Sequence, residues 1–381
     1  MEDRNPPRAR RLVVLGATGT VGRQALDILE RARSPLRVTA LSAHRSASGL
    51  EALAEALEAR QGLRPRTFLT AEAAQAESLR AFLLEGGYGV CLQAMVGAAG
   101  LPFSEAVLRA GRRLALANKE SLVLAGGLLM DLARQSGASV VPVDSEHSAI
   151  HQCLQGQPPD SVRRLWLTAS GGALRDLGPE QLDAVTPEQA LAHPNWDMGP
   201  RITVDSATMM NKALEILEAV HLFGVSPDRI GVLLHRQSVV HSLVEFVDGS
   251  ILAQMGPPDM AFPIHYALHA PGRRPAPLRG FDAGLFRHLD FEEPDPLRWP
   301  ALDLGFEAAR RGGAAGAVLN AADEVAVEAF LEGRIPFPAI VGLCRLALEE
   351  MPALEASSLE EIEAADAWAR ERVRSACASL S

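Results

Sequence analysis

The chain has few of the features that mark secreted, membrane-spanning or nucleic-acid-binding proteins. Its 381 residues include only four cysteines, which are far apart and show no C-x-x-C spacing. This indicates reduced, packed thiols and a cytoplasmic protein. The net charge of −10 argues against sequence-independent binding of nucleic acid. No apolar run reaches the roughly 18–20 residues of a membrane helix, and residues 1–10 contain no apolar signal region, so no membrane association is expected.

The length predicts more than one domain, and the order of apolar runs divides the chain into three parts. Residues 1–143 alternate short apolar runs with helical segments, which is typical of a Rossmann-like, doubly wound parallel sheet. Residues 144–269 are expected to form an α+β catalytic domain with a long loop over about 170–200. Residues 270–300 are proline-rich and predict a linker, and residues 301–381 predict a C-terminal helical bundle. The expected strands are 11–15, 36–41, 89–96, 113–117 and 139–143 in the first domain and 164–168, 230–234, 242–247 and 250–254 in the second.

A glycine-rich turn between the first strand and a helix starting near Val21 indicates a dinucleotide site. Residues 16–22 read GATGTVG, a G-x-x-G-x-x-G spacing rather than the stricter G-x-G-x-x-G. Glycine lets the backbone approach a pyrophosphate, and the start of the helix favours its negative charge. The alternative is a turn with a structural role only.

The end of the second strand favours NADP(H) over NAD(H). An NAD site usually places Asp or Glu about 20 residues beyond the glycine turn, where it holds the ribose 2′-hydroxyl. Residues 31–50 contain no acidic residue, and the strand ends in Ser42, Ala43, His44, Arg45 and Ser46. A cation and hydroxyls suit a 2′-phosphate, which a carboxylate would repel. The alternative for Arg45 is a solvated surface charge.

Two carboxylates, Asp144 and Glu146, follow the strand at 139–143. Ligands of open α/β sheets bind beyond the carboxyl ends of the strands, and residues i and i+2 of an extended segment point the same way. Both carboxylates are then able to reach one ion, and oxygen ligands suit Mg²⁺ or Mn²⁺ rather than zinc. An alternative stays equally open: Asp144 or Ser145 caps a helix that continues through residues 147–154.

A helix over residues 209–223 would place Asn211, Lys212 and Glu215 near one face. Asn211 and Lys212 offer donors to a phosphate, as does Ser206. Glu215 offers a third carboxylate to the metal. The alternative is a surface ion pair between Lys212 and Glu215. The methionine pair that precedes them argues for a partly buried position.

Three further stretches are ambiguous on their residues alone. Lys119, after the strand at 113–117, either holds substrate oxygens or is solvated. The loop over 170–200, with Trp196, is either a lid over a substrate or a packed surface loop. His147 and His151 stand four residues apart, but no third ligand has suitable spacing, so zinc is not expected.

The motifs together resemble the 1-deoxy-D-xylulose 5-phosphate reductoisomerase family. In order, they are GATGTVG (16–22), VGAAGL (96–101), LANKESLV (116–123), PVDSEH (142–147), LTASGGALRD (167–176), HPNWDMG (193–199), VDSATMMNKALE (204–215) and LNAADEVAV (319–327). The resemblance implies an NADPH- and divalent-metal-dependent enzyme of non-mevalonate isoprenoid biosynthesis. It would isomerise and reduce its sugar phosphate substrate, 1-deoxy-D-xylulose 5-phosphate, to 2-C-methyl-D-erythritol 4-phosphate. A homodimer with three domains is also implied.

The resemblance also implies a role for each matching residue. The metal, Mg²⁺ or Mn²⁺ with Co²⁺ possible, would be held by Asp144, Glu146 and Glu215. The catalytic and substrate-binding residues would be Lys119, Ser145, Glu146, Ser170, His193, Trp196, Ser206, Asn211, Lys212 and Glu215, of which Ser170, Ser206, Asn211 and Lys212 would hold the phosphate. The cofactor would contact Thr18, Gly19, Thr20, Val21, Asn118, Glu120 and Gly199, beside Ala43, His44, Arg45 and Ser46 at the 2′-phosphate.

The chain departs from the family pattern at two places. It has His44-Arg45-Ser46 where the family often has Gly-Lys/Arg-Asn, and His235-Arg236-Gln237-Ser238 where the family has His-Pro-Gln-Ser. The first site keeps its cation, Arg45. At the second site, the sequence does not decide the conformation of the turn. The retro-aldol/aldol route and the α-ketol shift fit the same residues.

Two other functions fit part of the sequence. A semialdehyde- or homoserine-type dehydrogenase has similar glycine loops, but the semialdehyde type needs an activated cysteine, and no cysteine here sits in a motif. A non-enzymatic NADPH sensor would have no use for a convergent metal and phosphate site.

Overall fold

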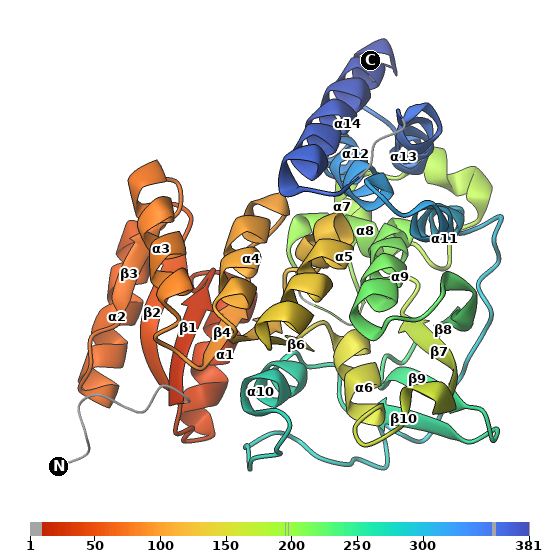
Figure 1. Cartoon of the computed structure of the whole chain (residues 1–381). Helices are drawn as coiled ribbons and strands as arrows, with labels where there is room; N and C mark the ends of the chain where they lie inside the picture. Colours follow the sequence, from red (N-terminus) through yellow and green to blue (C-terminus); the bar gives the residue numbers. More distant parts are fainter. Residues whose placement is uncertain (1–9, 195, 197, 353–355, 381) are drawn as a thin grey trace. The chain divides into compact units, whose positions relative to one another are not determined.

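The computed structural model describes residues 10–194, 196, 198–352 and 356–380, which form two compact units (Figure 1). The first unit comprises residues 10–121, 129–151 and 259–280. The second comprises residues 122–128, 152–258 and 281–380. Within the described ranges, no helix combines the length and the apolar character needed to cross a membrane.

The first unit is built on a six-stranded parallel sheet in the order β3-β2-β1-β4-β5-β6. Its strands are β1 (Arg11–Leu15), β2 (Arg37–Ala43), β3 (Arg66–Leu69), β4 (Val90–Gln93), β5 (Arg113–Leu116) and β6 (Ser139–Pro142). This order is that of a Rossmann-like, doubly wound sheet, so the predicted fold class is confirmed. The edge strand β3 was not predicted, because its sequence RTFL begins with two exposed residues and forms no apolar run.

Helices complete the first unit. They are α1 (Thr20–Arg31), α2 (Ala47–Gln61), α3 (Ala73–Glu85), α4 (Leu101–Arg109), the beginning and end of α5 (Lys119–Ser136), most of α6 (Ser145–Cys153) and α10 (Ala261–His269). A 3-10 turn, η2 (Ala98–Gly100), precedes α4. The helix predicted to start near Val21 begins one residue earlier, at Thr20.

The core of this unit draws on segments far apart in the sequence. Leu12 and Val14 of β1 belong to one fully buried cluster with Ile28 of α1 and Ile264 of α10. Burial of each large aliphatic side chain contributes about 1.5–3 kcal/mol. Residues 259–280 therefore group with the sheet of the first unit, although the sequence had assigned them to the catalytic domain and the linker.

The second unit contains a four-stranded sheet in the order β10-β9-β7-β8. Its strands are β7 (Val162–Ala169), β8 (Ile230–Leu234), β9 (Val240–Phe246) and β10 (Ile251–Met255), each within two residues of its predicted bounds. Strand β7 pairs in parallel with β8 and antiparallel with β9. The 3-10 helices of this unit are η3 (Pro159–Ser161), η4 (Pro179–Ala184) and η5 (Pro227–Arg229).

The helix predicted over residues 209–223 is confirmed, and a further helix that was not predicted precedes it. They are α9 (Met210–Phe223) and α8 (Pro200–Thr208), respectively. Met209 separates them because its φ of 65° lies in the left-handed region and ends α8. The long loop before α8 contains η4 and the one-turn helix α7 (Pro187–Ala190), and its residues 195 and 197 lie outside the described residues.

The helical C-terminal part follows the prediction. It consists of α11 (Ala301–Arg311), α12 (Ala315–Leu331), α13 (Ala339–Glu350) and α14 (Leu359–Leu380), the blue helices of Figure 1. Helix α12 is buried along most of its length and packs against α11, α13 and α14 and also against α8 and α9. Residues 281–300, the second half of the predicted linker, have little regular structure beyond a bridge between Leu234 and Glu292.

Candidate functional site

The glycine turn of the first unit has the geometry expected of a nucleotide-binding loop. Gly16 has a φ of 75°, and a Cβ there would lie 2.4 Å from the carbonyl oxygen of Ala94. The turn is closed by the Gly19 amide, which donates to the Gly16 carbonyl at 3.0 Å, and α1 begins at Thr20. Thr18, Thr20 and Val21 therefore lie at the start of α1, where backbone N–H groups are left without helical partners.

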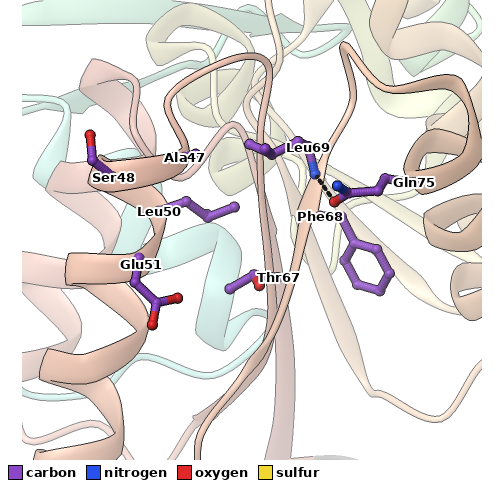
Figure 2. Close-up of a pocket in the computed structure, with 8 residues that line it drawn as sticks. All are labelled: Ala47, Ser48, Leu50, Glu51, Thr67, Phe68, Leu69 and Gln75. Carbon is purple, nitrogen blue, oxygen red and sulfur yellow. Dashed lines mark hydrogen bonds between the residues drawn. The ribbon is translucent and has the colours of Figure 1, made fainter.

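The predicted 2′-phosphate turn joins β2 to α2. Ala43 ends β2, Ser46 is the N-cap residue of α2, and His44 and Arg45 between them are exposed. An adjoining hollow of about 420 Å³ starts at Ala47 and lies between α2, β3 and the start of α3 (Figure 2). In this hollow the side-chain oxygen of Gln75 accepts from the amide of Leu69 at 2.8 Å.

Asn118, Lys119 and Glu120 follow β5 and are held by their own unit. The Asn118 amide donates to the carbonyl oxygen of Met95 at 2.9 Å and to Glu120 at 2.9 Å. Glu120 accepts from the amide of Gly97 at 3.1 Å. The Lys119 ammonium forms an ion pair with Asp144. Lys119 is buried, so the alternative of a solvated lysine is wrong.

The expectation that Asp144 and Glu146 lie in an extended segment is wrong. Helix α6 begins at Ser145, and its Ser148 amide donates to the Asp144 carbonyl oxygen at 2.8 Å. Glu146 thus lies in the first helical turn, where the Ser145 hydroxyl donates to it at 2.5 Å. The two carboxylates nevertheless converge, because one oxygen of Asp144 and one of Glu146 lie within 4.8 Å of each other.

In the second unit, Asn211, Lys212 and Glu215 form a buried group on α9. The Asn211 amide donates to Glu215 Oε1 at 2.5 Å, and the Lys212 ammonium donates to Oε2. The side chains of Lys212 and Glu215 are only 3% and 1% exposed. The predicted shared face is confirmed, and the alternative of a surface ion pair is wrong.

Ser170 and Ser206 lie on two segments that are in close contact. Ser170 follows β7, and Gly172, two residues later, has a φ of 73°. A Cβ at Gly172 would lie 2.5 Å from the carbonyl oxygen of Ser206 and 2.6 Å from the Cα of Ala207. Only a glycine therefore lets this loop lie against the end of α8 that carries Ser206.

His193 is connected to both Ser170 and Trp196. The Trp196 amide donates to Nδ1 of His193 at 3.0 Å, so the neutral ring carries its proton on Nε2 and donates it to Ser170 Oγ, 3.0 Å away. Burial, with a contribution from the charge of Arg175, lowers the pKa of His193 to about 4. The Trp196 ring lies 6.4 Å from that of His241 on β9, so this part of the predicted lid rests on its own sheet.

The sequence did not predict the contacts of two residues near Ser170. Arg175 donates to the carbonyl oxygen of Ser170 at 3.0 Å, and Gly172 makes the close approach to Ser206. Both stand in the quoted motif LTASGGALRD, and the paired glycines there were the available signal. Gly199, expected to contact the cofactor, is the N-cap residue of α8 in this unit.

Comparisons with known proteins cover nearly the whole chain. The profile of 1-deoxy-D-xylulose 5-phosphate reductoisomerase matches residues 12–126, and two profiles of the C-terminal domains of that enzyme match residues 140–223 and 255–372. The reductoisomerase of Xanthomonas axonopodis pv. citri is 49% identical over 377 residues, which is 95% of each chain. That of Cupriavidus taiwanensis is 46% identical over 381 residues, which is 96% of this chain and 97% of the relative.

Solved structures agree with the sequence relatives. The reductoisomerase of Zymomonas mobilis, in complex with NADPH, has a TM-score of 0.87 at 41% identity and covers 97% of this chain and 100% of its own. A reductoisomerase in complex with NADPH, fosmidomycin and magnesium has a TM-score of 0.89 at 36% identity, over 97% and 99% of the two chains. On these matches, the chain belongs to the 1-deoxy-D-xylulose 5-phosphate reductoisomerase family.

Proposed function

We propose that this chain converts 1-deoxy-D-xylulose 5-phosphate to 2-C-methyl-D-erythritol 4-phosphate, using NADPH and a divalent metal ion. The observation that carries the proposal is the family match, at 46–49% identity over about 95% of the chain. The residues assigned to NADPH are mainly in the first unit, and those assigned to the substrate phosphate are in the second.

NADPH is assigned to the first unit. The pyrophosphate would lie at the turn formed by residues 16–22, where α1 begins. Its 2′-phosphate would lie at the turn between β2 and α2, where Arg45 supplies a positive charge and Ser46 a hydroxyl at the start of α2. Since no acidic residue occurs between residues 31 and 50, nothing in this segment repels that phosphate.

The metal is assigned to Asp144, Glu146 and Glu215. The convergence of Asp144 and Glu146 within 4.8 Å supports this, and an all-carboxylate set suits Mg²⁺ or Mn²⁺. When bound, the divalent ion supplies Lewis-acid stabilisation for negative charge that develops on the substrate oxygens. Lys119, which forms an ion pair with Asp144, would bind substrate oxygens beside that carboxylate.

The phosphate of the substrate is assigned to Ser170, Ser206, Asn211 and Lys212 in the second unit. Lys212 supplies the positive charge, while His193, neutral because of its lowered pKa, orients the Ser170 hydroxyl through a hydrogen bond from Nε2. Trp196 would exclude water as the apolar part of a lid. The chain then breaks and remakes a carbon–carbon bond and reduces the branched aldehyde with hydride from NADPH. Both the retro-aldol and the α-ketol route fit these residues.

The direct test is oxidation of NADPH with 1-deoxy-D-xylulose 5-phosphate, with and without Mg²⁺ or Mn²⁺. We expect turnover only when both substrate and metal are present. Absence of turnover with either metal, or an unchanged rate after chelation, would contradict the proposal. Activity that is lost on thiol modification but does not require metal would instead support a semialdehyde-type dehydrogenase.

Glu215→Gln tests the role of the second unit in metal binding. The substitution removes one ligand charge, so turnover should fall at least about a hundredfold and the Mg²⁺ concentration for half-maximal rate should rise. Glu328→Gln, at an exposed position of α12, is the matched control and should leave both quantities unchanged. Near-normal turnover of Glu215→Gln at saturating Mg²⁺ would argue against a metal ligand at this position.

We also infer that the protein is a cytoplasmic homodimer. The edge strand β10 leaves Ile251, Leu252 and Met255 exposed, which supports an apolar surface covered by a second copy. Light scattering at micromolar concentration tests this, and a monomer mass would overturn it.

A further inference from the structure

Arg201, in the first turn of α8, lies at the centre of a group of polar side chains that includes none of the predicted site residues. Its guanidinium contacts three side chains of α12: Glu324 at 2.7 Å, Asn320 at 2.8 Å and Asp323 at 3.1 Å. These three acceptors stand at i, i+3 and i+4 and so share one face of α12. The Nε of Arg201 also lies 3.5 Å from Asp205, one turn further along α8.

This group is buried and ionic. Asp323 is fully buried, and the side chains of Asp205 and Arg201 are 5% and 20% exposed. Burial raises the pKa of Asp323, and the positive charge of Arg201 opposes that rise. Because desolvation offsets much of the attraction in such groups, their net contribution to stability is small. The planar guanidinium, fixed by acceptors in several directions, instead sets the position of one helix on the other.

The helix that Arg201 fixes carries Ser206. Helix α8 has only nine residues, and its N-cap residue Gly199 ends the predicted lid. Asp205, which contacts Arg201, directly precedes Ser206 in the chain. On the other side, the backbone of Gly172 lies against the carbonyl oxygen of Ser206. Ser206 is thus held between α12 and the loop that follows β7.

We propose that Arg201 and Asp323 are positioning residues for the phosphate of the substrate. By holding α8 on α12, they fix the Ser206 hydroxyl where it meets the phosphate, so the C-terminal helices contribute to substrate binding without touching the substrate. This inference rests on the proposed function, because it takes Ser206 as a phosphate contact.

The alternative is that the same contacts only hold the helices together. Arg370 of α14 provides a matched comparison, because it shares Glu324 with Arg201 but, among the residues that the structure describes, forms hydrogen bonds and ion pairs only with Glu324 and Asp366 and none with α8. It contacts Glu324 at 2.5 Å and Asp366 at 2.6 Å. Its removal perturbs the ionic group and the packing of α14 on α12 while leaving Arg201 with Asp323 and Asn320.

The experiment measures binding without turnover. With Mg²⁺ present and NADPH omitted, calorimetry gives the Kd of 1-deoxy-D-xylulose 5-phosphate and that of the sugar without its phosphate. The Kd of the sugar divided by the Kd of the sugar phosphate isolates the contribution of the phosphate. In Arg201→Met this ratio should fall at least about tenfold, since a hydrogen bond to a charged group contributes roughly tenfold to a hundredfold in affinity. In Arg370→Met the ratio should match that of the unmodified protein, although the melting temperature falls.

Two substitutions of Asp323 make the test specific. Asp323→Asn keeps an oxygen that accepts from Arg201, so the ratio should stay within about twofold of the unmodified value. Asp323→Leu removes the acceptor and should behave like Arg201→Met. If Arg201→Met does not fold, Arg201→Lys, whose single ammonium replaces a forked donor, is the milder variant and should give an intermediate ratio.

The inference is overturned if Arg201→Met lowers the melting temperature but leaves the ratio unchanged, or if Arg370→Met lowers the ratio equally. The proposed function itself fails if the unmodified protein binds the sugar phosphate no more tightly than the sugar without its phosphate. The inference then fails with it.

Discussion

The buried pair of Lys212 and Glu215 gives a prediction whose magnitude follows from the structure. In Lys212→Met, Glu215 keeps its hydrogen bond from Asn211 but loses the ammonium, at a site only 1% exposed. Removing one partner of a buried ion pair costs about 3–5 kcal/mol. The remaining Asn211 bond favours the lower value, about 3 kcal/mol. At roughly 2–4 °C per kcal/mol, the melting temperature of the metal-free protein should fall by about 10 °C.

Thermal unfolding in the presence of a chelator measures this shift, and a double substitution tests its cause. In Lys212→Met/Glu215→Gln neither member of the pair is charged, so most of the lost stability should return. Arg134→Met is the control, because Arg134 forms an i, i+3 pair with Asp131 at the surface, where both side chains are more than half exposed. It should cost less than about 1 kcal/mol. A double variant less stable than Lys212→Met, or a Lys212→Met no less stable than the control, would refute the reasoning.

Three further predictions concern other parts of the site. Arg45→Asp should weaken NADPH binding at least about tenfold more than NADH binding, since it replaces the cation at the 2′-phosphate by an anion; equal weakening of both in fluorescence titrations would remove Arg45 from that role. Gly172→Ala should raise the KM for the sugar phosphate at least about tenfold, because the added Cβ meets the Ser206 carbonyl oxygen at 2.5 Å, whereas Gly62→Ala, with a φ of 68° and nothing within 4 Å, carries only the backbone strain. The pKa of His193 is lowered to about 4, so its contribution to stability is complete above about pH 6.5 and is lost as the pH falls toward 4. Thermal midpoints of His193→Gln should therefore depend less on pH across this window than those of the unmodified protein, and parallel curves would contradict the assignment.

The sequence predicted those parts of the fold whose hydrophobic pattern is decided locally. The strands β1, β4 and β5 are buried on both faces and therefore appear as continuous apolar runs. Strand β3 lacks such a run because half of it is exposed. Local pattern also fails to show which core a segment joins, so residues 261–269, which form α10, were expected in the catalytic domain but group with the first unit.

The site was predictable where its chemistry lies in short motifs, as for Asn211, Lys212 and Glu215. The left-handed conformation of Met209 was not, because no glycine marks the break between α8 and α9. The contact of Arg201 with Asp323 joins residues 122 positions apart in the sequence. Asp323 stands in the quoted motif LNAADEVAV, but nothing in that motif indicates Arg201 as its partner, so the contact is visible only in the folded chain.

The hydrogen bonds of His193 have a consequence for how binding responds to pH. Its two ring nitrogens are occupied by Trp196 and Ser170, and its pKa of about 4 matches that of His241 beside the lid. Neither imidazole changes its charge near neutral pH. The second ionisation of the substrate phosphate, with a pKa near 6, does fall in this range. A rise in affinity between about pH 5 and 7 is then expected from formation of the ligand dianion. A phosphonate with a different second pKa should shift this rise, whereas a sulfate ester, which has no second ionisation, should abolish it.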